Sequence, residues 1–165
     1  MELLRLLGLV MIALLVASCA GSKGLGTGVP GSRADAVLPQ DVRVIAPRPD
    51  MESNKARFSG IWSGVWIGLG DRLPHTLVVE TLSEQTFSGV YATGDSLTPG
   101  LSLQARWWRI YGTVESGRLT AKLPPSAGDA TVTYVLNSDG TVSGTFTNRL
   151  GFSSKAHLTK TGAGG

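Results

Sequence analysis

The side chains that could carry out acid–base or metal chemistry are few, and their spacing does not bring them together. His75 and His157 lie far apart and have no cysteine or regularly spaced carboxylate beside them, so no zinc-binding pattern is present. Each histidine is expected at the surface or in a hydrogen bond. Glu80 falls inside a predicted strand, where we expect its side chain to face solvent. The other acidic residues after position 55 fall at predicted turns; they are Asp71, Glu84, Asp95, Glu115, Asp129 and Asp139.

The sequence also lacks the groupings that enzymatic catalysis requires. Catalysis needs a nucleophile beside a base, a pair of carboxylates in different environments, or a metal constellation. Serine and threonine are numerous here because turns favour serine and strands favour threonine. We therefore predict a protein that is not an enzyme, with no catalytic residue, no metal and no cofactor.

Cys19 is the residue whose surroundings predict a covalent modification. It is the single cysteine of the chain, so no intrachain disulfide can form. The apolar run 6–17 before it is too short for the roughly 20 residues of a membrane span but fits the core of a signal peptide. The residues Val16-Ala17-Ser18-Cys19 resemble the lipobox of bacterial lipoproteins. The resemblance implies that residues 1–18 are a cleaved signal peptide and that Cys19 carries diacylglycerol.

The predicted anchor implies a location and a partner. Two or three acyl chains hold a protein stably at a membrane, whereas one chain gives only marginal affinity. Lipoproteins of two-membrane bacteria are retained in the inner membrane by aspartate after the cysteine, and Ala20 occupies that position here. We therefore expect a cell-envelope lipoprotein that partners the membrane through its lipid, in the outer membrane and facing the periplasm.

The segment that follows the anchor is expected to be a flexible linker. Residues 19–55 are rich in glycine, proline and serine and have no sustained apolar period, so ordering them would not offset the lost conformational entropy. An alternative is that Val42, Val44 and Ile45 form a short strand or docking segment. Residues 162–165 are expected to be a disordered tail.

The rest of the chain, residues 56–161, predicts one all-β domain. Apolar residues alternate with polar ones between turns rich in glycine, proline, asparagine and aspartate. The predicted strands are 58–67, 76–82, 86–93, 103–114, 118–123, 131–136, 141–147 and 154–160. Closing the first strand on the last removes two exposed sheet edges, so we predict an eight-stranded antiparallel up-and-down β-barrel. A barrel of this size is either filled by side chains or holds one small ligand.

Two short motifs make this domain resemble the calycin barrels. Arg57-Phe58-Ser59-Gly60-Ile61-Trp62 is similar to the opening of a lipocalin, and Gly89-x-Tyr91 is similar to the third strand of avidin-type barrels. The lipocalin resemblance implies that Gly60 and Trp62 close the barrel floor beneath a basic side chain of the last strand, Lys155 or Lys160. Ser63-Gly64 does not match the polar residues that bind biotin in avidin-type barrels.

An aromatic and basic run, Arg106-Trp107-Trp108-Arg109-Ile110-Tyr111, lies in the fourth predicted strand. Neighbouring residues of a strand face opposite ways, so Trp107 and Trp108 lie on different faces and one of them points away from the interior. We assign Arg106 and Trp108 to a surface contact, since arginine and aromatics are enriched in interface cores. The alternative is that the linker or residues 94–101 cover the outward tryptophan. The expected ligand-lining residues are Trp66, Tyr91, Trp107 and Tyr134.

Three functions remain after these observations. The formal net charge of +3 is small and dispersed, which argues against nucleic-acid binding. The favoured function is a non-enzymatic envelope module that binds a small apolar ligand or an envelope protein. One alternative is an inhibitor, because anchor, linker and small barrel resemble the periplasmic lipoprotein inhibitors of proteases or lysozyme. Those families usually carry a disulfide, which this chain cannot form. The other alternative is a structural protein with a packed interior.

Overall fold

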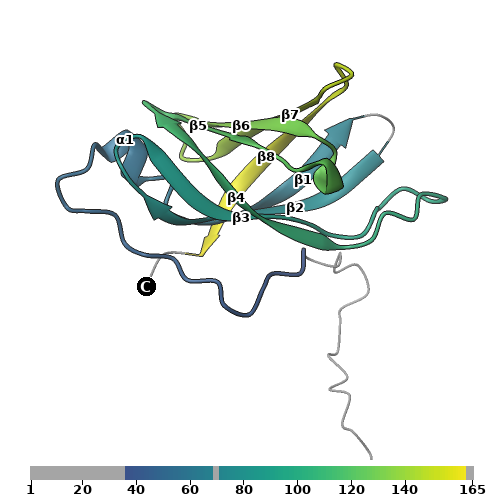
Figure 1. Cartoon of the computed structure of the whole chain (residues 1–165), viewed down its shortest axis with the longest axis horizontal. Coiled ribbons are helices and arrows are strands. Elements are labelled where there is room, and N and C mark those ends of the chain that lie inside the picture. The colour runs from purple at the N-terminus through teal and green to yellow at the C-terminus, as the bar shows by residue number, and fades with distance from the viewer. Residues whose placement is uncertain (1–35, 69–70, 163–165) are drawn as a thin grey trace, which may run out of the picture. The chain divides into compact units, whose positions relative to one another are not determined.

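The computed structural model describes residues 36–68 and 71–162. They form a closed barrel of eight antiparallel strands, each hydrogen-bonded to its neighbours in chain order (Figure 1). This confirms the predicted fold class. The strands are β1 (Gly60–Gly68), β2 (Asp71–Leu82), β3 (Thr86–Thr93), β4 (Arg106–Glu115), β5 (Arg118–Lys122), β6 (Ala130–Leu136), β7 (Val142–Asn148) and β8 (Ser153–Gly162). Two short helices accompany them, α1 (Ser53–Ala56) and the 3₁₀ turn η1 (Pro125–Ala127).

The barrel closes through β1, which pairs with both β2 and β8. Trp62 lies opposite Leu77 on β2 and opposite Lys160 on β8, with a bulge between Ile61 and Trp62 on the β8 side. Glycine is needed where the backbones of neighbouring strands approach closely. A Cβ on Gly64 would lie 2.1 Å from the carbonyl oxygen of His157, so a larger residue has no room there.

The buried core runs through the barrel interior, and Trp62 lies at one end of it. Trp62 is buried there, and its indole N–H donates to the carbonyl oxygen of Phe58 at 2.7 Å. Lys160 Nζ lies 5.3 Å from the centre of the Trp62 ring and donates to the carbonyl oxygen of Arg57 at 3.3 Å. Of the two lysines named by the lipocalin resemblance, Lys160 is therefore the one that covers Trp62. We call this the closed end of the barrel.

A second apolar cluster lies outside the barrel, on β2 and β3. Val78, Val90 and Ala92 face outward, and residues 36–45 lie against them through Ala36, Leu38, Val42 and Val44 (Figure 1). The backbone N–H of Ile45 donates to the carbonyl oxygen of Glu80 at 2.8 Å. These residues fall in the predicted linker, and their packing against β2 and β3 matches the alternative prediction of a docking segment. We call residues 36–52 the outer segment.

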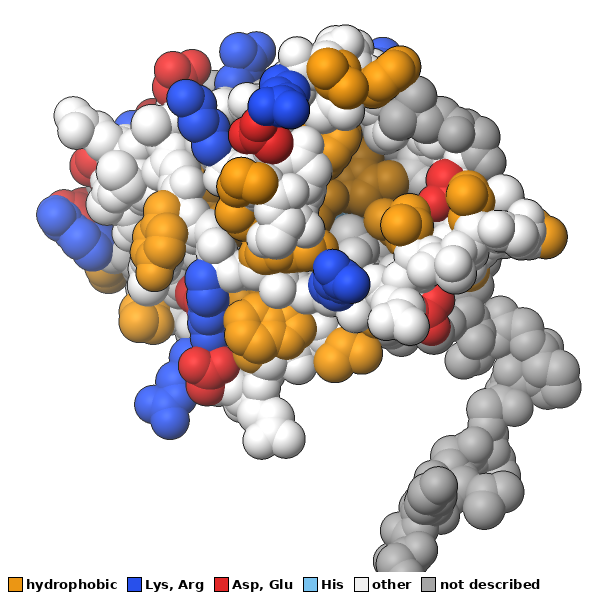
Figure 2. Space-filling model, turned by 45° about the vertical axis from the view of Figure 1, so that its right-hand side comes forward, with side chains coloured by type: hydrophobic (Ala, Val, Ile, Leu, Met, Phe, Trp, Pro, Cys, Tyr) orange, Lys and Arg blue, Asp and Glu red, His pale blue; other side chains and the backbone are white. Residues whose placement is uncertain are grey.

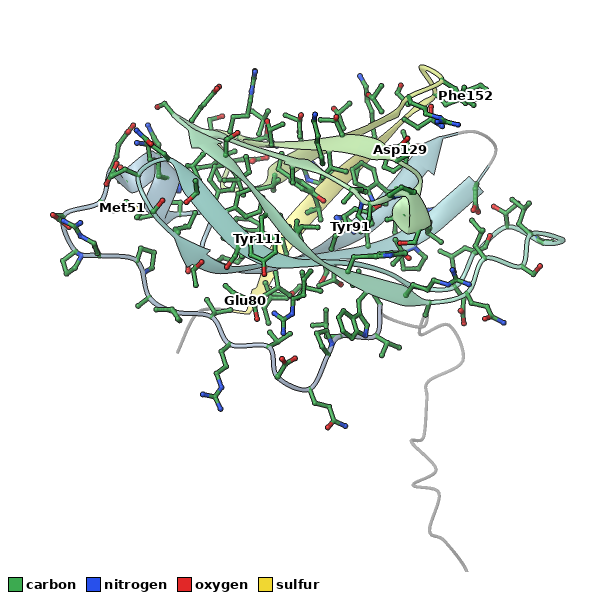
Figure 3. The ribbon with its side chains drawn as sticks, viewed as in Figure 1. Met51, Glu80, Tyr91, Tyr111, Asp129 and Phe152 are labelled. Atoms are coloured by element: carbon green, nitrogen blue, oxygen red, sulfur yellow. The ribbon has the colours of Figure 1, made fainter. Side chains whose placement is uncertain are left out.

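Glu80 holds the outer segment by its side chain as well. Its carboxylate accepts the backbone N–H of Arg43 at 3.1 Å and pairs with Arg109 of β4, which also reaches Asp41 at 2.7 Å (Figure 3). The expectation that Glu80 faces solvent was wrong, because this residue is only 8% exposed. Its side chain does point away from the barrel interior, but the outer segment covers it.

Several sequence predictions lie outside the described residues. They concern the signal motif Val16, Ala17 and Ser18, the lipid attachment at Cys19, and the linker up to residue 35. In the part of the chain that the structure describes, no helix has the length and apolar composition to cross a membrane.

Candidate functional site

The end of the barrel opposite Trp62 is open and hollow. Two cavities lie there, of about 270 Å³ and about 400 Å³. They share the walls Leu73, Tyr91, Leu103 and Phe146, so they adjoin. Figure 2 shows a hollow with a hydrophobic floor on this side of the molecule. We refer to both together as the mouth of the barrel.

Aromatic rings surround His75 at the base of the mouth. The His75 ring centre lies 4.9 Å from that of Trp66, 4.7 Å from that of Tyr91 and 5.9 Å from that of Tyr134. Phe146 meets Trp66 edge-on at 6.2 Å and extends this cluster toward the opening. Flat apolar surfaces of this kind bind flat apolar ligands through stacked and edge-on contacts.

His75 is held in one neutral form. Its Nδ1 lies 2.8 Å from the carbonyl oxygen of Ala92, which can only accept, so Nδ1 carries the proton and donates. Nε2 is then an acceptor, and the Tyr134 hydroxyl at 2.9 Å donates to it. Burial in the barrel lowers the pKa of His75 to about 4, although the bond to Ala92 opposes this change. The imidazole is thus uncharged at neutral pH and both of its nitrogens are engaged.

Two polar groups beside His75 are not satisfied in this way. The Trp66 indole N–H is buried and has no acceptor of normal hydrogen-bond geometry among the described residues. The hydroxyl of Tyr91 interacts with this N–H, and Tyr91 lines both cavities, so the hydroxyl can donate into the mouth. Burial raises the pKa of Tyr91 well above its ordinary value, and the neighbouring Trp66 N–H opposes this increase. Tyr91 therefore remains a protonated, neutral donor at neutral pH.

The strand register makes room for these rings. Trp66 lies opposite Ala156, Ala156 opposite Gly144, and Gly144 opposite Tyr134, so two small residues separate two large ones across four strands. A Cβ on Gly144 would lie 2.9 Å from the Trp66 ring. Glycine at this position therefore lets the Trp66 ring extend across the barrel interior.

The rim of the mouth is built by loops that polar side chains hold. The Trp108 indole N–H donates to the hydroxyl of Ser126 at 3.1 Å and so holds η1 beside the opening. Asp71 accepts the Ser96 hydroxyl at 2.7 Å, which fixes the loop between β3 and β4. Burial alone would raise the pKa of Asp71, but hydrogen bonds from Ser96, Thr98 and the Arg72 backbone together lower it. This carboxylate is consequently charged at neutral pH.

Three of the four predicted lining residues lie in this region. Trp66 and Tyr91 line the cavities, and Tyr134 lies behind His75 in the packed core. The prediction for Trp107 was wrong, because it lies on the outer face and is 43% exposed. Trp108 faces inward and lines the larger cavity, so its predicted surface contact was also wrong in orientation, whereas Arg106 is exposed at the rim of the same cavity.

The register explains this reversal. Trp108 lies opposite Tyr91, whose ring is inside, and the two ring centres are 5.9 Å apart. Ile110 and Val114 are buried on the same side of β4. Continuing the two-residue period from Trp108 through Ile110 to Val114 would have placed Trp108 inside from the sequence.

Sequence reasoning also missed His75 as part of the site. His75 makes hydrogen bonds, as one of the two expectations stated, but it does so in the interior. The alternation Leu73, His75, Leu77, Val79 was the available signal, since the other members of this alternating set are all apolar. Among the described residues no group of three His, Cys, Asp or Glu side chains could hold a metal ion.

Comparison with known proteins supports the fold. No known protein family matches the chain, and no curated protein sequence matches it. The chain is similar in structure to the redesigned β-barrel mFAP1 bound to DFHBI, with a TM-score of 0.54 and 16% identity over 66% of this chain and 100% of that one. It is also similar to a de novo designed fluorescence-activating β-barrel, with a TM-score of 0.49 and 14% identity over 67% of this chain and 100% of that one. The first likeness shows the eight-stranded barrel architecture.

Proposed function

We propose that this protein is a non-enzymatic binding module of the bacterial cell envelope, anchored by lipid on Cys19, whose barrel mouth holds a small, flat, apolar ligand. The observation that carries the proposal is the pair of adjoining cavities walled by Trp66, Tyr91, Trp108 and Phe146. Cavities of about 300–1,000 Å³ with apolar and aromatic walls are typical of small-molecule sites. The similar barrel mFAP1 was solved bound to DFHBI, so this architecture can hold a small molecule.

The chemistry of the mouth supports binding in preference to catalysis. A general base needs a free lone pair and a pKa near the working pH. His75 has a pKa of about 4, and its Nε2 lone pair already accepts from Tyr134. Tyr91 has a raised pKa, so it does not ionise to become a nucleophile at neutral pH. These groups can orient a ligand without reacting with it.

Ligand binding can be measured with N-phenyl-1-naphthylamine, a neutral probe whose fluorescence rises in apolar surroundings. The full chain should bind it saturably. Trp108→Ala should weaken binding about fivefold or more, because an aromatic contact contributes roughly 1 kcal/mol beyond the buried area. Trp107→Ala is the matched control, since this neighbour lies on the outer face, and it should leave the affinity unchanged. Equal losses in both variants, or no saturable binding by the wild type, would contradict the proposal.

The anchor is tested separately through Cys19→Ser. The support for lipidation is the lipobox resemblance of residues 16–19 and the apolar run before them. Wild-type protein from whole cells should enter the detergent phase on partitioning and incorporate labelled palmitate. The variant should remain unprocessed or soluble and unlabelled. A variant that is processed and membrane-bound like the wild type would rule out this anchor.

A further inference from the structure

We infer that the ligand of the barrel mouth carries a neutral hydrogen-bond acceptor, such as a carbonyl oxygen, and that Trp66 and Tyr91 bind this atom. This inference rests on the proposed function and specifies the chemical class of the ligand. It follows from the hydrogen-bonding groups at the base of the mouth.

The base of the mouth holds more donors than acceptors. Trp66 is only 5% exposed, and its N–H has no acceptor of normal geometry among the described residues. The Tyr91 hydroxyl lies near this N–H, and Tyr91 lines both cavities, so its hydroxyl can donate to a molecule in the mouth. If the indole turned to donate to the Tyr91 oxygen, the hydroxyl proton would still be available to such a molecule. Buried donors are rarely left unpaired in native proteins, because each one has lost its hydrogen bonds to water.

Neighbouring acceptors are already in use. His75 Nε2 accepts from the Tyr134 hydroxyl at 2.9 Å, and the carbonyl oxygen of Ala92 accepts from His75 Nδ1 at 2.8 Å. A molecule that enters the mouth can supply the acceptor that these two groups do not. Trp66 and Tyr91 both line the first cavity, so a ligand in this cavity lies beside both side chains.

The charges around the mouth favour a neutral acceptor over an anion. Of the described residues that line the two cavities, Arg106 is the one cation, and its side chain is exposed at the rim. His75 is neutral, and the Asp71 carboxylate lines the first cavity. A carboxylate buried beside Trp66 and Tyr91 would lose its hydration without gaining a counterion, whereas a carbonyl oxygen would gain two donors.

Three naphthalene derivatives of nearly the same shape test the inference. 2-Acetylnaphthalene carries a carbonyl group, 2-isopropenylnaphthalene replaces the oxygen by CH₂, and 2-naphthoate carries a charged carboxylate. Each would displace N-phenyl-1-naphthylamine from the full chain at pH 7. We expect the ketone to bind roughly tenfold more tightly than either analogue, which is the effect of one or two buried hydrogen bonds.

Two variants locate this preference. Tyr91→Phe removes the hydroxyl and keeps the ring, and Trp66→Phe removes the indole N–H, so each should reduce the ratio of ketone to alkene affinity toward one. Tyr111→Phe is the matched control because Tyr111 is 73% exposed on the outer face, and it should keep the wild-type ratio. Thermal melts of all variants confirm that they are folded.

The outcomes separate the two claims. Equal wild-type affinity for the ketone and the alkene, or a ratio unaffected by Tyr91→Phe and Trp66→Phe, would overturn the inference and leave the proposed function standing. Naphthoate binding as tightly as the ketone would overturn the requirement for a neutral acceptor. Failure of all three compounds to displace the probe would count against the proposed function itself.

Discussion

Mild acid should destabilise the barrel through His75. Burial lowers the pKa of this imidazole from 6.5 to about 4 in the folded protein, whereas in the unfolded chain it returns to its ordinary value. Between these two values the unfolded state binds a proton that the folded state excludes, so stability falls as the pH falls from 6.5 toward 4. Below about pH 4 both states are protonated and the loss levels off.

The size of the effect follows from the two pKa values. A difference of one pKa unit corresponds to about 1.4 kcal/mol. From pH 7 to pH 5.5 the free energy of unfolding should fall by about 1.2 kcal/mol, and by pH 4.5 the loss should reach about 2.4 kcal/mol. Asp71 and Asp139 have lowered pKa values, so they affect stability in another pH range. Their contribution to the free energy of unfolding is present above the ordinary pKa of 3.8 and is lost as the pH falls below it. The range from pH 4.5 to 6.5 therefore isolates His75 from these two carboxylates.

Urea unfolding of the full chain, followed by circular dichroism at half-unit steps from pH 7 to pH 4.5, measures this loss. The control is His75→Gln, which removes the titrating ring and keeps a donor and an acceptor. The variant will be less stable at pH 7, but its stability should change little over the same range. A wild-type profile that is flat between pH 6.5 and 4.5, or a variant with the same slope as wild type, would refute the burial and neutrality of His75.

Three further results are expected from the packing. Trp62→Ala at the closed end should lower the free energy of unfolding by about 3–5 kcal/mol in urea melts, because a fully buried ring and its hydrogen bond to the Phe58 carbonyl oxygen are lost. Trp107→Ala on the outer face should lower it by under about 1 kcal/mol. Similar losses in both variants would contradict the assignment of Trp62 to the closed end. Arg109→Met should leave the Glu80 carboxylate poorly compensated and cost about 1–2 kcal/mol, with faster trypsin cleavage after Arg43, which precedes Val44. Arg118→Met, on an exposed side chain, is the control, and equal cleavage in both variants would show that the ion pair does not hold the outer segment. Deleting residues 20–52 should lower the melting temperature, because it uncovers Val78, Val90 and Ala92; an unchanged melt would mean that the outer segment adds nothing to stability.

The strands were largely predictable because alternation and turn residues are local signals. β3 was predicted with its observed bounds, 86–93. β2 begins at Asp71, five residues earlier than predicted, because Asp71 was assigned to a turn. The structure accommodates Pro74 at the point where the pairing of β2 with β3 ends. The Pro74 carbonyl oxygen accepts the backbone N–H of Gly94, the residue that follows the end of β3. Residues 103–105 were predicted as strand but lie in the rim loop, where Asp95 accepts the backbone N–H of Ala105 at 2.8 Å.

The site was less predictable because it depends on which strands meet. The sequence shows that Trp66, Tyr91 and Tyr134 are aromatic, but only the register brings them around His75 and opposes Tyr91 to Trp108. The burial of Glu80 depends on the outer segment, whose composition alone favours disorder. Contacts between segments distant in the sequence have no local signature, so alternation cannot reveal them.

The four tryptophans of the chain provide the most direct test of the claim that the mouth binds a ligand. Each indole N–H gives its own signal in a ¹H–¹⁵N spectrum of the full chain. On titration with 2-acetylnaphthalene, the signals of Trp66 and Trp108 should shift saturably, because these residues line the cavities. The signals of Trp62 at the closed end and Trp107 on the outer face should stay in place. A largest shift at Trp107, or unchanged signals for Trp66 and Trp108 up to the solubility limit of the ketone, would contradict the account.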